Sequence, residues 1–263
     1  MKIKSKVMAV LLLSFLFGVQ LVKAQDDNMF NHLSAGVSTG IDGLVGLHVA
    51  IPIGHHVQVR TGISFMPKFS YNNDYDVRSI ANSYGYSDYY GEYGRNLGDV
   101  EVKGELNMCD FNLLFDIYPS CHSSFRFTAG AYIGKSKVVT LKNTTPISVS
   151  SGDLDKIGVE IGDYLIPSSI DGYVDGSIKV NSFKPYLGVG FGRAVPKKRV
   201  SVMFDLGVQF WGKPGVYAKD FESGNDVKLS KMNFEGGDDD FNKILSKIVV
   251  YPVLSLKIFG RIL

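Results

Sequence analysis

Cysteine, long apolar runs and an excess of either charge are all scarce in this chain of 263 residues. Two cysteines are too few for the disulfide framework of a small secreted domain. No segment after residue 24 contains 18 consecutive apolar residues, so no helical membrane span is predicted there. Without the four lysines of residues 1–24, 24 basic residues stand against 26 acidic ones, a net charge of −2. This balance argues against nucleic acid as a partner.

The first 24 residues have the layout of a secretory signal peptide. A lysine-rich start precedes an apolar run over 7–22, and Ala24 completes a cleavage site before Gln25. The alternative is an uncleaved anchor, but about 16 apolar residues fall short of the ~20 that a spanning helix needs. Gln25 stands where a lipoprotein would have cysteine, so no lipid anchor is predicted. We expect a signal peptide over 1–24 and a single domain over 25–263.

The mature chain alternates between apolar and other residues, and it is rich in glycine and aromatic residues, with 29 Gly, 17 Phe and 14 Tyr. The segment 200–212 is the clearest case, because every second residue is apolar: Val200, Val202, Phe204, Leu206, Val208 and Phe210. Successive side chains of a strand point to opposite faces, so this period predicts a strand with one apolar face. The segments 57–65, 125–133 and 252–258 repeat the pattern. The fold class is therefore predicted to be all-β.

Eight strands are predicted, at 32–40, 44–53, 57–72, 99–118, 124–143, 172–195, 199–217 and 247–263. Short proline-containing turns at 51–56, 118–122 and 195–199 alternate with long polar connections at 73–98, 145–170 and 219–245. One further connection, near 41–43, is short. An even number of strands with short turns at one end is typical of an outer-membrane barrel. We therefore predict an eight-stranded, antiparallel, up-and-down transmembrane β-barrel with its proline turns in the periplasm.

A secreted, water-soluble β-barrel or sandwich would show the same alternation with its apolar face inward. Three features favour the membrane barrel. Several predicted strands are longer than the ~9–11 residues that cross a bilayer. The face opposite the apolar one is rich in glycine and charge, which suits a narrow polar lumen. The last predicted strand runs to the end of the chain, as a closing strand must.

Four stretches carry a resemblance to a known family: Ser-Ala-Gly-Val-Ser-Thr-Gly at 34–40, the Pro-Ile-Gly turn at 52–54, Lys-Pro-Tyr-Leu-Gly-Val-Gly-Phe-Gly at 184–192, and the closing strand. They are similar to the outer-membrane β-barrel domain family of Gram-negative bacteria, the small porin-like group, over residues 30–263. The resemblance implies a location in the cell outer membrane, with outer-membrane lipid and the assembly machinery as partners. Such barrels usually end in an aromatic residue that this machinery reads, whereas this chain ends in Leu263, with Phe259 four residues earlier.

Seven charged residues are predicted to point into the lumen: Arg60, Asp110, Asp116, Arg126, Lys184, Asp205 and Lys257. Their mixed signs allow them to pair, as buried charges must. Asp116 and Arg126 are equidistant from Cys121, which predicts that they face each other across a hairpin at the periplasmic end of the lumen. An ion-selective constriction is the functional alternative to a set of structural ion pairs, and we favour the structural pairs.

The predicted loop 71–93 contains seven of the 14 tyrosines, including Tyr84, Tyr86, Tyr89, Tyr90 and Tyr93. Tyrosine supplies rigid, amphipathic contact area and is favoured at recognition surfaces. The same rings would also suit the level of the lipid headgroups. Both interpretations stay open, and the sequence names no extracellular partner.

No catalytic, cofactor or metal site is predicted. Neighbouring His55 and His56 point to opposite sides of an extended chain, and the three long connections contain no histidine for Ser–His catalysis. The alternating glycines of 188–192 are followed by a proline turn rather than the helix that a nucleotide loop needs. The acidic stretches 153–163 and 238–240 are interpreted as solvated loops, with weak Ca²⁺ binding as the alternative.

Cys109 and Cys121 are predicted to remain free thiols. Twelve residues of strand separate them, which is roughly 35 Å at ~3.3 Å per residue. A disulfide needs Cα atoms within about 7 Å.

The sequence thus predicts a non-enzymatic outer-membrane barrel with a structural or surface-interaction role through its loops. The alternatives are a narrow porin-like channel for small solutes, which the family resemblance implies, and a secreted barrel that binds a ligand inside. An eight-stranded barrel has room only for its own side chains, which disfavours the channel.

Overall fold

The computed structural model describes residues 32–79, 96–120, 122–148, 157–221, 223–232, 241, 243, 245 and 247–262. The predicted signal peptide lies outside these residues. Fourteen strands form one sheet: β1 (Ser34–Gly40), β2 (Gly43–Pro52), β3 (Val57–Ser79), β4 (Asn96–Ile117), β5 (Phe125–Gly134), β6 (Lys137–Asn143), β7 (Ile157–Ile161), β8 (Tyr164–Pro167), β9 (Asp175–Lys179), β10 (Phe183–Phe191), β11 (Val200–Phe210), β12 (Gly215–Lys219), β13 (Asp226–Lys228) and β14 (Val250–Arg261). The described residues from Phe241 to Lys247 are helical. Within the described ranges, no helix is long and apolar enough to span a membrane.

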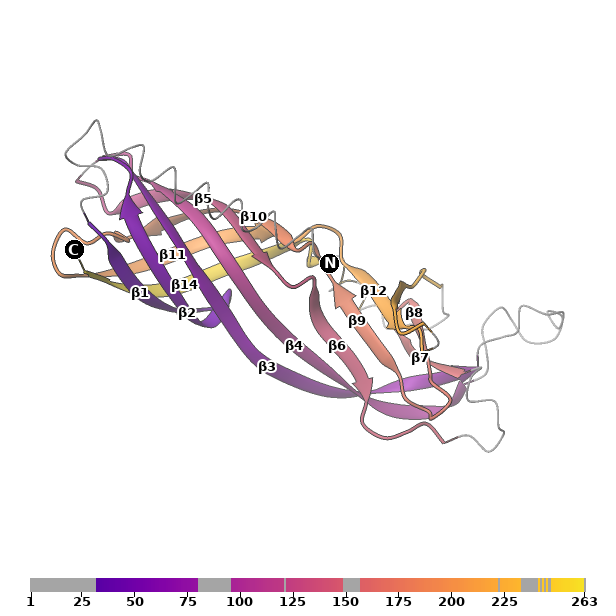
Figure 1. Cartoon of the computed structure of the whole chain (residues 1–263). Coiled ribbons are helices and arrows are strands. Elements are labelled where there is room, and N and C mark those ends of the chain that lie inside the picture. Colours follow the sequence, from indigo (N-terminus) through magenta and orange to yellow (C-terminus); the bar gives the residue numbers. More distant parts are fainter. Residues whose placement is uncertain are drawn as a thin grey trace.

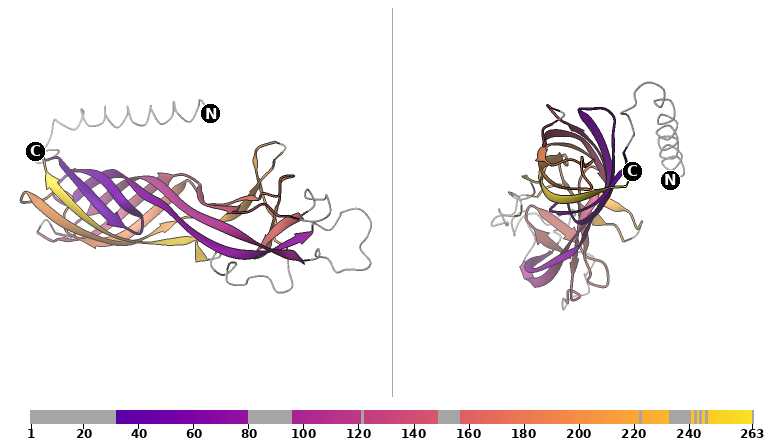
Figure 2. Two further views of the ribbon diagram at one scale, coloured as in Figure 1. Left: turned by 90° about the horizontal axis from the view of Figure 1, so that it is seen from below. Right: turned by 90° about the vertical axis from the view of Figure 1, so that its left-hand side faces the viewer.

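The pairing of the strands returns to the first strand. β1 pairs with β2 on one side and with β14 on the other, so that Val37 lies opposite both Leu47 and Ile258. From β2 the pairing runs through β3, β4, β5, β10 and β11 to β14, and every pair is antiparallel. Figure 2 shows these strands wrapping around a common axis. The all-β, antiparallel class predicted from the sequence is confirmed.

β3 and β4 are about twice as long as the other strands of this group, and they continue beyond it (Figure 1). β6 pairs with the far half of β4, and β9, β12 and β13 follow it in order. β7 pairs with the end of β3 and forms a hairpin with β8. We call this outer part the extension. It has its own apolar core, to which β3, β4 and all the added strands except β13 contribute, and Val159, Ile161 and Ile166 are its fully buried centre.

Three of the predicted single strands are wrong in extent. The segments 124–143, 172–195 and 199–217 each contain two strands, interrupted near 135–136, 180–182 and 211–214. The interruptions lie at one level, because the backbone amide of Val180 donates to Ser136 O and that of Asn181 donates to Trp211 O. All three long connections also contain strand residues. β7 and β8 fall within 145–170, β13 falls within 219–245, and the predicted loop over 73–98 is wrong at both ends, because β3 continues to Ser79 and β4 begins at Asn96. The sheet leaves its ring at these interruptions and opens into the extension.

The outer face of the strands β1 to β5, β10, β11 and β14 is apolar and exposed. Leu47, Val202 and Phe191 expose 65%, 59% and 57% of their surface. We call this surface the apolar belt; its other exposed large side chains include Val37, Ile63, Phe65, Phe111, Phe115, Phe127, Leu187, Phe204, Leu206, Leu254, Leu256 and Ile258. The alternating pattern of the sequence is thus confirmed, with the apolar residues outside. A soluble barrel would have the opposite arrangement.

In β3 one irregularity reverses this arrangement. Ile63 and Phe65 are exposed in the apolar belt, whereas Val77, also an odd-numbered residue, is buried in the core of the extension. The register with β4 shifts between Met66 and Phe69. A bulge adds one residue to one strand and so exchanges the two faces beyond it. Pro67, which lacks an amide hydrogen, lies within this shift.

Candidate functional site

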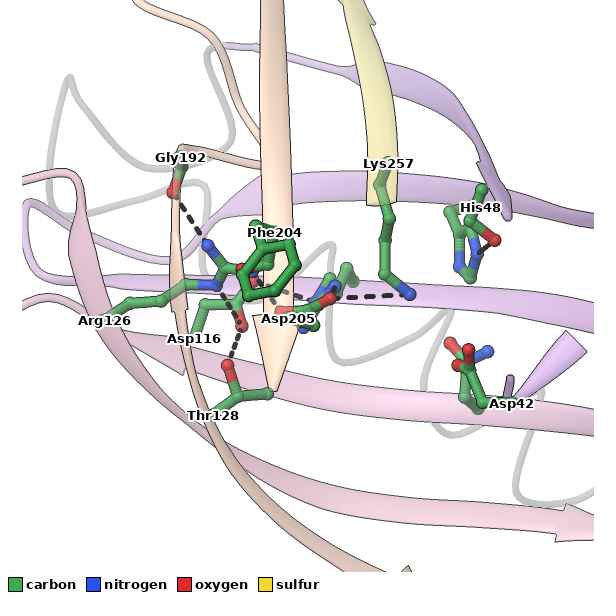
Figure 3. A network of polar contacts seen from close by, with 12 residues as sticks. Asp42, His48, Asp116, Arg126, Thr128, Gly192, Phe204, Asp205 and Lys257 are labelled. Atoms are coloured by element: carbon green, nitrogen blue, oxygen red, sulfur yellow. Dashed lines mark hydrogen bonds and ion pairs between the residues drawn. The ribbon is translucent and has the colours of Figure 1, made fainter. Parts of the chain in front are cut away.

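Charged side chains from five strands meet inside the ring (Figure 3). We call Arg60 of β3, Asp116 of β4, Arg126 of β5, Asp205 of β11 and Lys257 of β14 the charge network. None of the five exposes more than 1% of its surface. Alternation accounts for their direction, because the residues before and after each of them in the strand point to the outer face of the sheet. Three cations share two carboxylates, so the network carries one excess positive charge.

Asp205 is the most connected member of the network. Arg60 binds it with two parallel hydrogen bonds, of 2.7 Å from Nη1 to Oδ2 and 3.0 Å from Nη2 to Oδ1. Arg126 Nη2 also donates to Asp205 Oδ1, and Lys257 Nζ lies 3.5 Å from Oδ2. A carboxylate that accepts from forked guanidinium groups is held more tightly than one in a simple ion pair. Asp205 therefore joins the strands β3, β5, β11 and β14 across the lumen.

Asp116 and Arg126 lie together, with Arg126 Nε 3.2 Å from Asp116 Oδ1. The predicted register is nevertheless wrong by two residues. Asp116 lies directly opposite Thr128, not Arg126, and Thr128 Oγ1 donates to Asp116 Oδ1 over 2.7 Å. The hairpin is centred one residue beyond Cys121, so Arg126 reaches Asp116 diagonally. Its length also lets Arg126 Nη1 donate to Gly192 O, over 2.9 Å, as Figure 3 shows.

The two remaining charged residues predicted in the lumen form a separate pair. Lys184 Nζ lies 2.8 Å and 2.9 Å from the two carboxylate oxygens of Asp110, and both residues are buried. Lys184 also lies 5.2 Å from the centre of the Trp211 ring. The pair lies further toward the extension than the charge network, because Asp110 is six residues from Asp116 along β4. All seven residues proposed for the lumen thus lie inside, in two groups.

The connection between β10 and β11 closes one end of the ring, which the sequence analysis missed. Ala194 and Val195 are buried there against Met203 and Phe259. The amide of Val195 donates to Gln58 Oε1 over 3.0 Å. The sequence predicts only an ordinary proline turn over 195–199. The sequence feature that could have indicated this closure is the apolar pair directly before Pro196, because solvated turns are usually built from polar residues, glycine and proline.

Aromatic residues close the ring on the other side of the network. The Tyr132 hydroxyl donates to Asp42 Oδ2 over 3.0 Å, and Asp42 comes from the tight turn between β1 and β2. Trp211 stacks on Tyr251 with ring centres 4.2 Å apart, and the Tyr251 hydroxyl donates to Ile41 O over 2.7 Å. Apolar layers therefore stand on both sides of the buried charges.

Outside the ring, the two ends of the extension sheet are joined by an ion pair. Lys231 Nζ lies 2.9 Å from Asp163 Oδ2 in the turn between β7 and β8, and the amide of Met232 donates to Asp163 O. The hydrogen bond from the ammonium group to Asp163 raises the pKa of Lys231. This contact brings the segment after β13 against β7 and β8, although no strand pairing closes the extension within the described residues.

We expect the substitution Gly190→Ala to destabilise the ring by about 1–3 kcal/mol, as overpacking does. A Cβ atom there would lie 2.5 Å from Phe204 O and 2.7 Å from Arg126 Nη2, so the network or the backbone must shift. Gly104→Ala is the matched control, because its nearest neighbours are 3.7 Å away. Urea unfolding of both variants measures the difference. Equal midpoints would show that the network tolerates displacement.

The other predicted residues are placed as follows. Tyr84, Tyr86, Tyr89, Tyr90, Tyr93 and Cys121 lie outside the described residues, as do 153–156 and 238–240 of the two acidic stretches. The interpretation of 153–163 as a solvated loop is wrong for its second half, because Glu160 is buried in β7 and paired with Arg78. Cys109 is a free thiol on the outward face of β4. Across the described parts of the chain, no three His, Cys, Asp or Glu side chains gather as metal ligands.

Comparison with known proteins finds likeness in structure but not in sequence. No family model matches the chain, and no curated protein matches it. The crystal structure of Acinetobacter baumannii CarO2 is 16% identical, with a TM-score of 0.45, and the match covers 88% of this chain and 98% of that one. A major outer membrane protein from Thermus thermophilus is 16% identical, with a TM-score of 0.38 and the same coverages. With TM-scores below 0.5, these likenesses do not decide the architecture, which rests on the pairing of this chain's own strands.

Proposed function

We propose that β1, β2, β3, β4, β5, β10, β11 and β14 form an eight-stranded transmembrane barrel in the outer membrane. Its lumen is filled by side chains, and its role is structural or in surface interaction rather than enzymatic. One observation carries the proposal: the ring is apolar and exposed outside, and charged and buried inside. Lipid is the solvent that such a surface fits, since a closed sheet satisfies all its backbone groups. Outer-membrane lipid and the assembly machinery are the partners that this location requires.

Two features support this proposal over a secreted, ligand-binding barrel. The apolar belt surrounds the ring, whereas soluble monomers rarely expose contiguous apolar patches larger than a few hundred Å². The interior contains ion pairs and packed side chains where a ligand cavity would lie. The extension supports a role outside the cell, because it has an apolar core of its own and carries charged pairs such as Lys142 with Asp175 on its surface. The tyrosine-rich residues Tyr84, Tyr86, Tyr89, Tyr90 and Tyr93 stay a candidate recognition surface on the basis of their sequence.

We expect the purified protein to migrate faster on an unheated gel than after boiling, and its band to resist carbonate washing of membranes. A closed barrel keeps its compact form in detergent until it is heated, which explains both results. A carbonate-soluble protein without this shift would overturn the proposal. The second candidate function, a narrow channel, is tested in planar bilayers, where a lumen blocked by Asp205, Tyr132 and Val195 predicts no discrete conductance steps. Regular steps from the folded protein would favour the channel.

A further inference from the structure

The end of the ring that carries the short turns has an unusual charge. This end consists of the connections 53–56, 118–124 and 192–199, together with the start of β1 and the end of β14. The three connections contain no Asp or Glu at all. They contain Arg193, Lys197, Lys198 and Arg199, and Arg261 ends β14. We call Lys197, Lys198, Arg199 and Arg261 the basic rim; all four are exposed.

The basic rim brings like charges side by side. The backbone amide of Arg261 at the end of β14 donates to Arg199 O over 2.9 Å, so Arg199, directly before β11, lies beside Arg261. None of the ion pairs between described residues includes a member of the rim. Like charges on neighbouring strands oppose pairing unless an anion lies between them.

Charges in the extension are arranged differently. Lys142 lies 3.2 Å from Asp175 and Lys103 lies 2.9 Å from Glu105, so these two lysines of the extension have carboxylate partners. The short connections of the turn end, by contrast, contain bases and no Asp or Glu to pair with them. Arg193 differs from the rim, because its guanidinium lies 4.5 Å from the centre of the Tyr118 ring and packs in the mouth of the ring.

The basic rim lies at the edge of the apolar belt. Arg199 precedes Val200, which exposes 61% of its surface, and Arg261 precedes Ile262, which exposes 60%. In a bilayer, the residues that end the apolar surface lie at the level of the phosphate groups, and long basic side chains extend to that level. A soluble polyanion would not require the bases to adjoin apolar residues.

From this charge, exposure and position, we propose that the basic rim binds the headgroups of anionic phospholipids in the leaflet that faces the turn end. The inference rests on the proposed membrane barrel. The excess of four bases supplies the counterions that phosphate oxygens need, and the neighbouring belt residues cover the adjoining acyl chains. The rim then fixes the depth of the barrel in the membrane at the end opposite the extension.

The test uses the full protein in nanodiscs that contain phosphatidylcholine and phosphatidylglycerol in equal amounts, with native mass spectrometry of the lipids that stay bound. We expect phosphatidylglycerol to be retained over phosphatidylcholine. In the double variant Arg199→Gln/Arg261→Gln, the ratio of bound phosphatidylglycerol to phosphatidylcholine should fall about tenfold. The control Lys142→Gln/Lys228→Gln removes the same charge from the extension and should keep it.

Three results would overturn the inference. Equal retention of both lipids by the wild type would show that the protein does not prefer anionic lipid. An equal loss of the preference in the control variant would show that the basic rim is not the binding site. Salt-sensitive binding of polyglutamate without retained phosphatidylglycerol would identify a soluble polyanion as the partner instead. Failure of the heat-shifting protein to enter nanodiscs at all would refute the membrane barrel itself, which separates that failure from a failure of the rim.

Discussion

Asp205→Asn is expected to cost the barrel about 3–5 kcal/mol of its free energy of unfolding, the usual effect of breaking a buried ion pair. The substitution keeps the shape of the side chain and removes its charge. Arg60, Arg126 and Lys257 then share only Asp116, within an interior that none of them can leave. Urea unfolding in detergent micelles measures the loss, and the fluorescence of Trp211, the only tryptophan, reports on the same interior.

Asp175→Asn is the control for this substitution. Asp175 is paired with Lys142, whose side chain exposes 59% of its surface, so the pair is screened by water. We expect a change of less than about 1 kcal/mol. If Asp205→Asn is as mild as Asp175→Asn, the charge network does not hold the ring together, and a hydrated, conducting lumen becomes the better description.

Leu206→Arg is expected to destabilise the protein in a bilayer by about 2–4 kcal/mol, as a cation at the midplane of a transmembrane barrel does. Leu206 exposes 51% of its surface and lies opposite both Val189 and Leu254, in the middle of the apolar belt. The same substitution on a water-exposed strand would be nearly neutral. Folding into lipid vesicles, followed by urea titration, measures the difference.

Val227→Arg provides the comparison. Val227 exposes 52% of its surface, as much as Leu206, but it belongs to β13 of the extension. We expect a change within about 0.5 kcal/mol there. Two residues of equal exposure thus distinguish a lipid environment from water. Equal, small effects at both positions would mean that the belt faces water or another protein surface, and the membrane assignment would fail.

The candidate lumen residues could be found from the sequence, because one rule suffices for them. On an alternating strand, a charged residue such as Arg60 or Asp205 faces away from the apolar set, whichever side that set occupies. The partners were harder to predict. Arg126 and Asp116 meet diagonally because the hairpin is centred one residue later than the turn residues indicated. A register depends on the geometry of the turn, and proline and cysteine in the turn do not specify it.

The inserted segment at Ala194 and Val195 shows a second limit. Local patterns describe a turn by its proline and its basic residues, and they carry no information on what lies across the ring. Val195 is buried against Met203 and Phe259, and Gln58, 137 positions away, accepts a hydrogen bond from its amide. A contact between residues so far apart is decided by the closure of the sheet, which no local pattern records.

The sequence by itself determined the class of the fold, the strands of the ring and the identity of the charged residues within it, because alternation with a period of two is a local property. Only the tertiary structure decided which side the apolar residues occupy along the whole length of a strand. In β3 most odd-numbered residues are apolar or aromatic on both sides of Pro67, with Thr61 and Asn73 among the exceptions, yet Phe65 faces outward and Val77 faces the core of the extension. The bulge between Met66 and Phe69 makes this exchange. Because of the bulge, one alternating sequence suits both environments. The apolar residues face outward where the strand crosses the proposed membrane, and they face inward where the strand enters water.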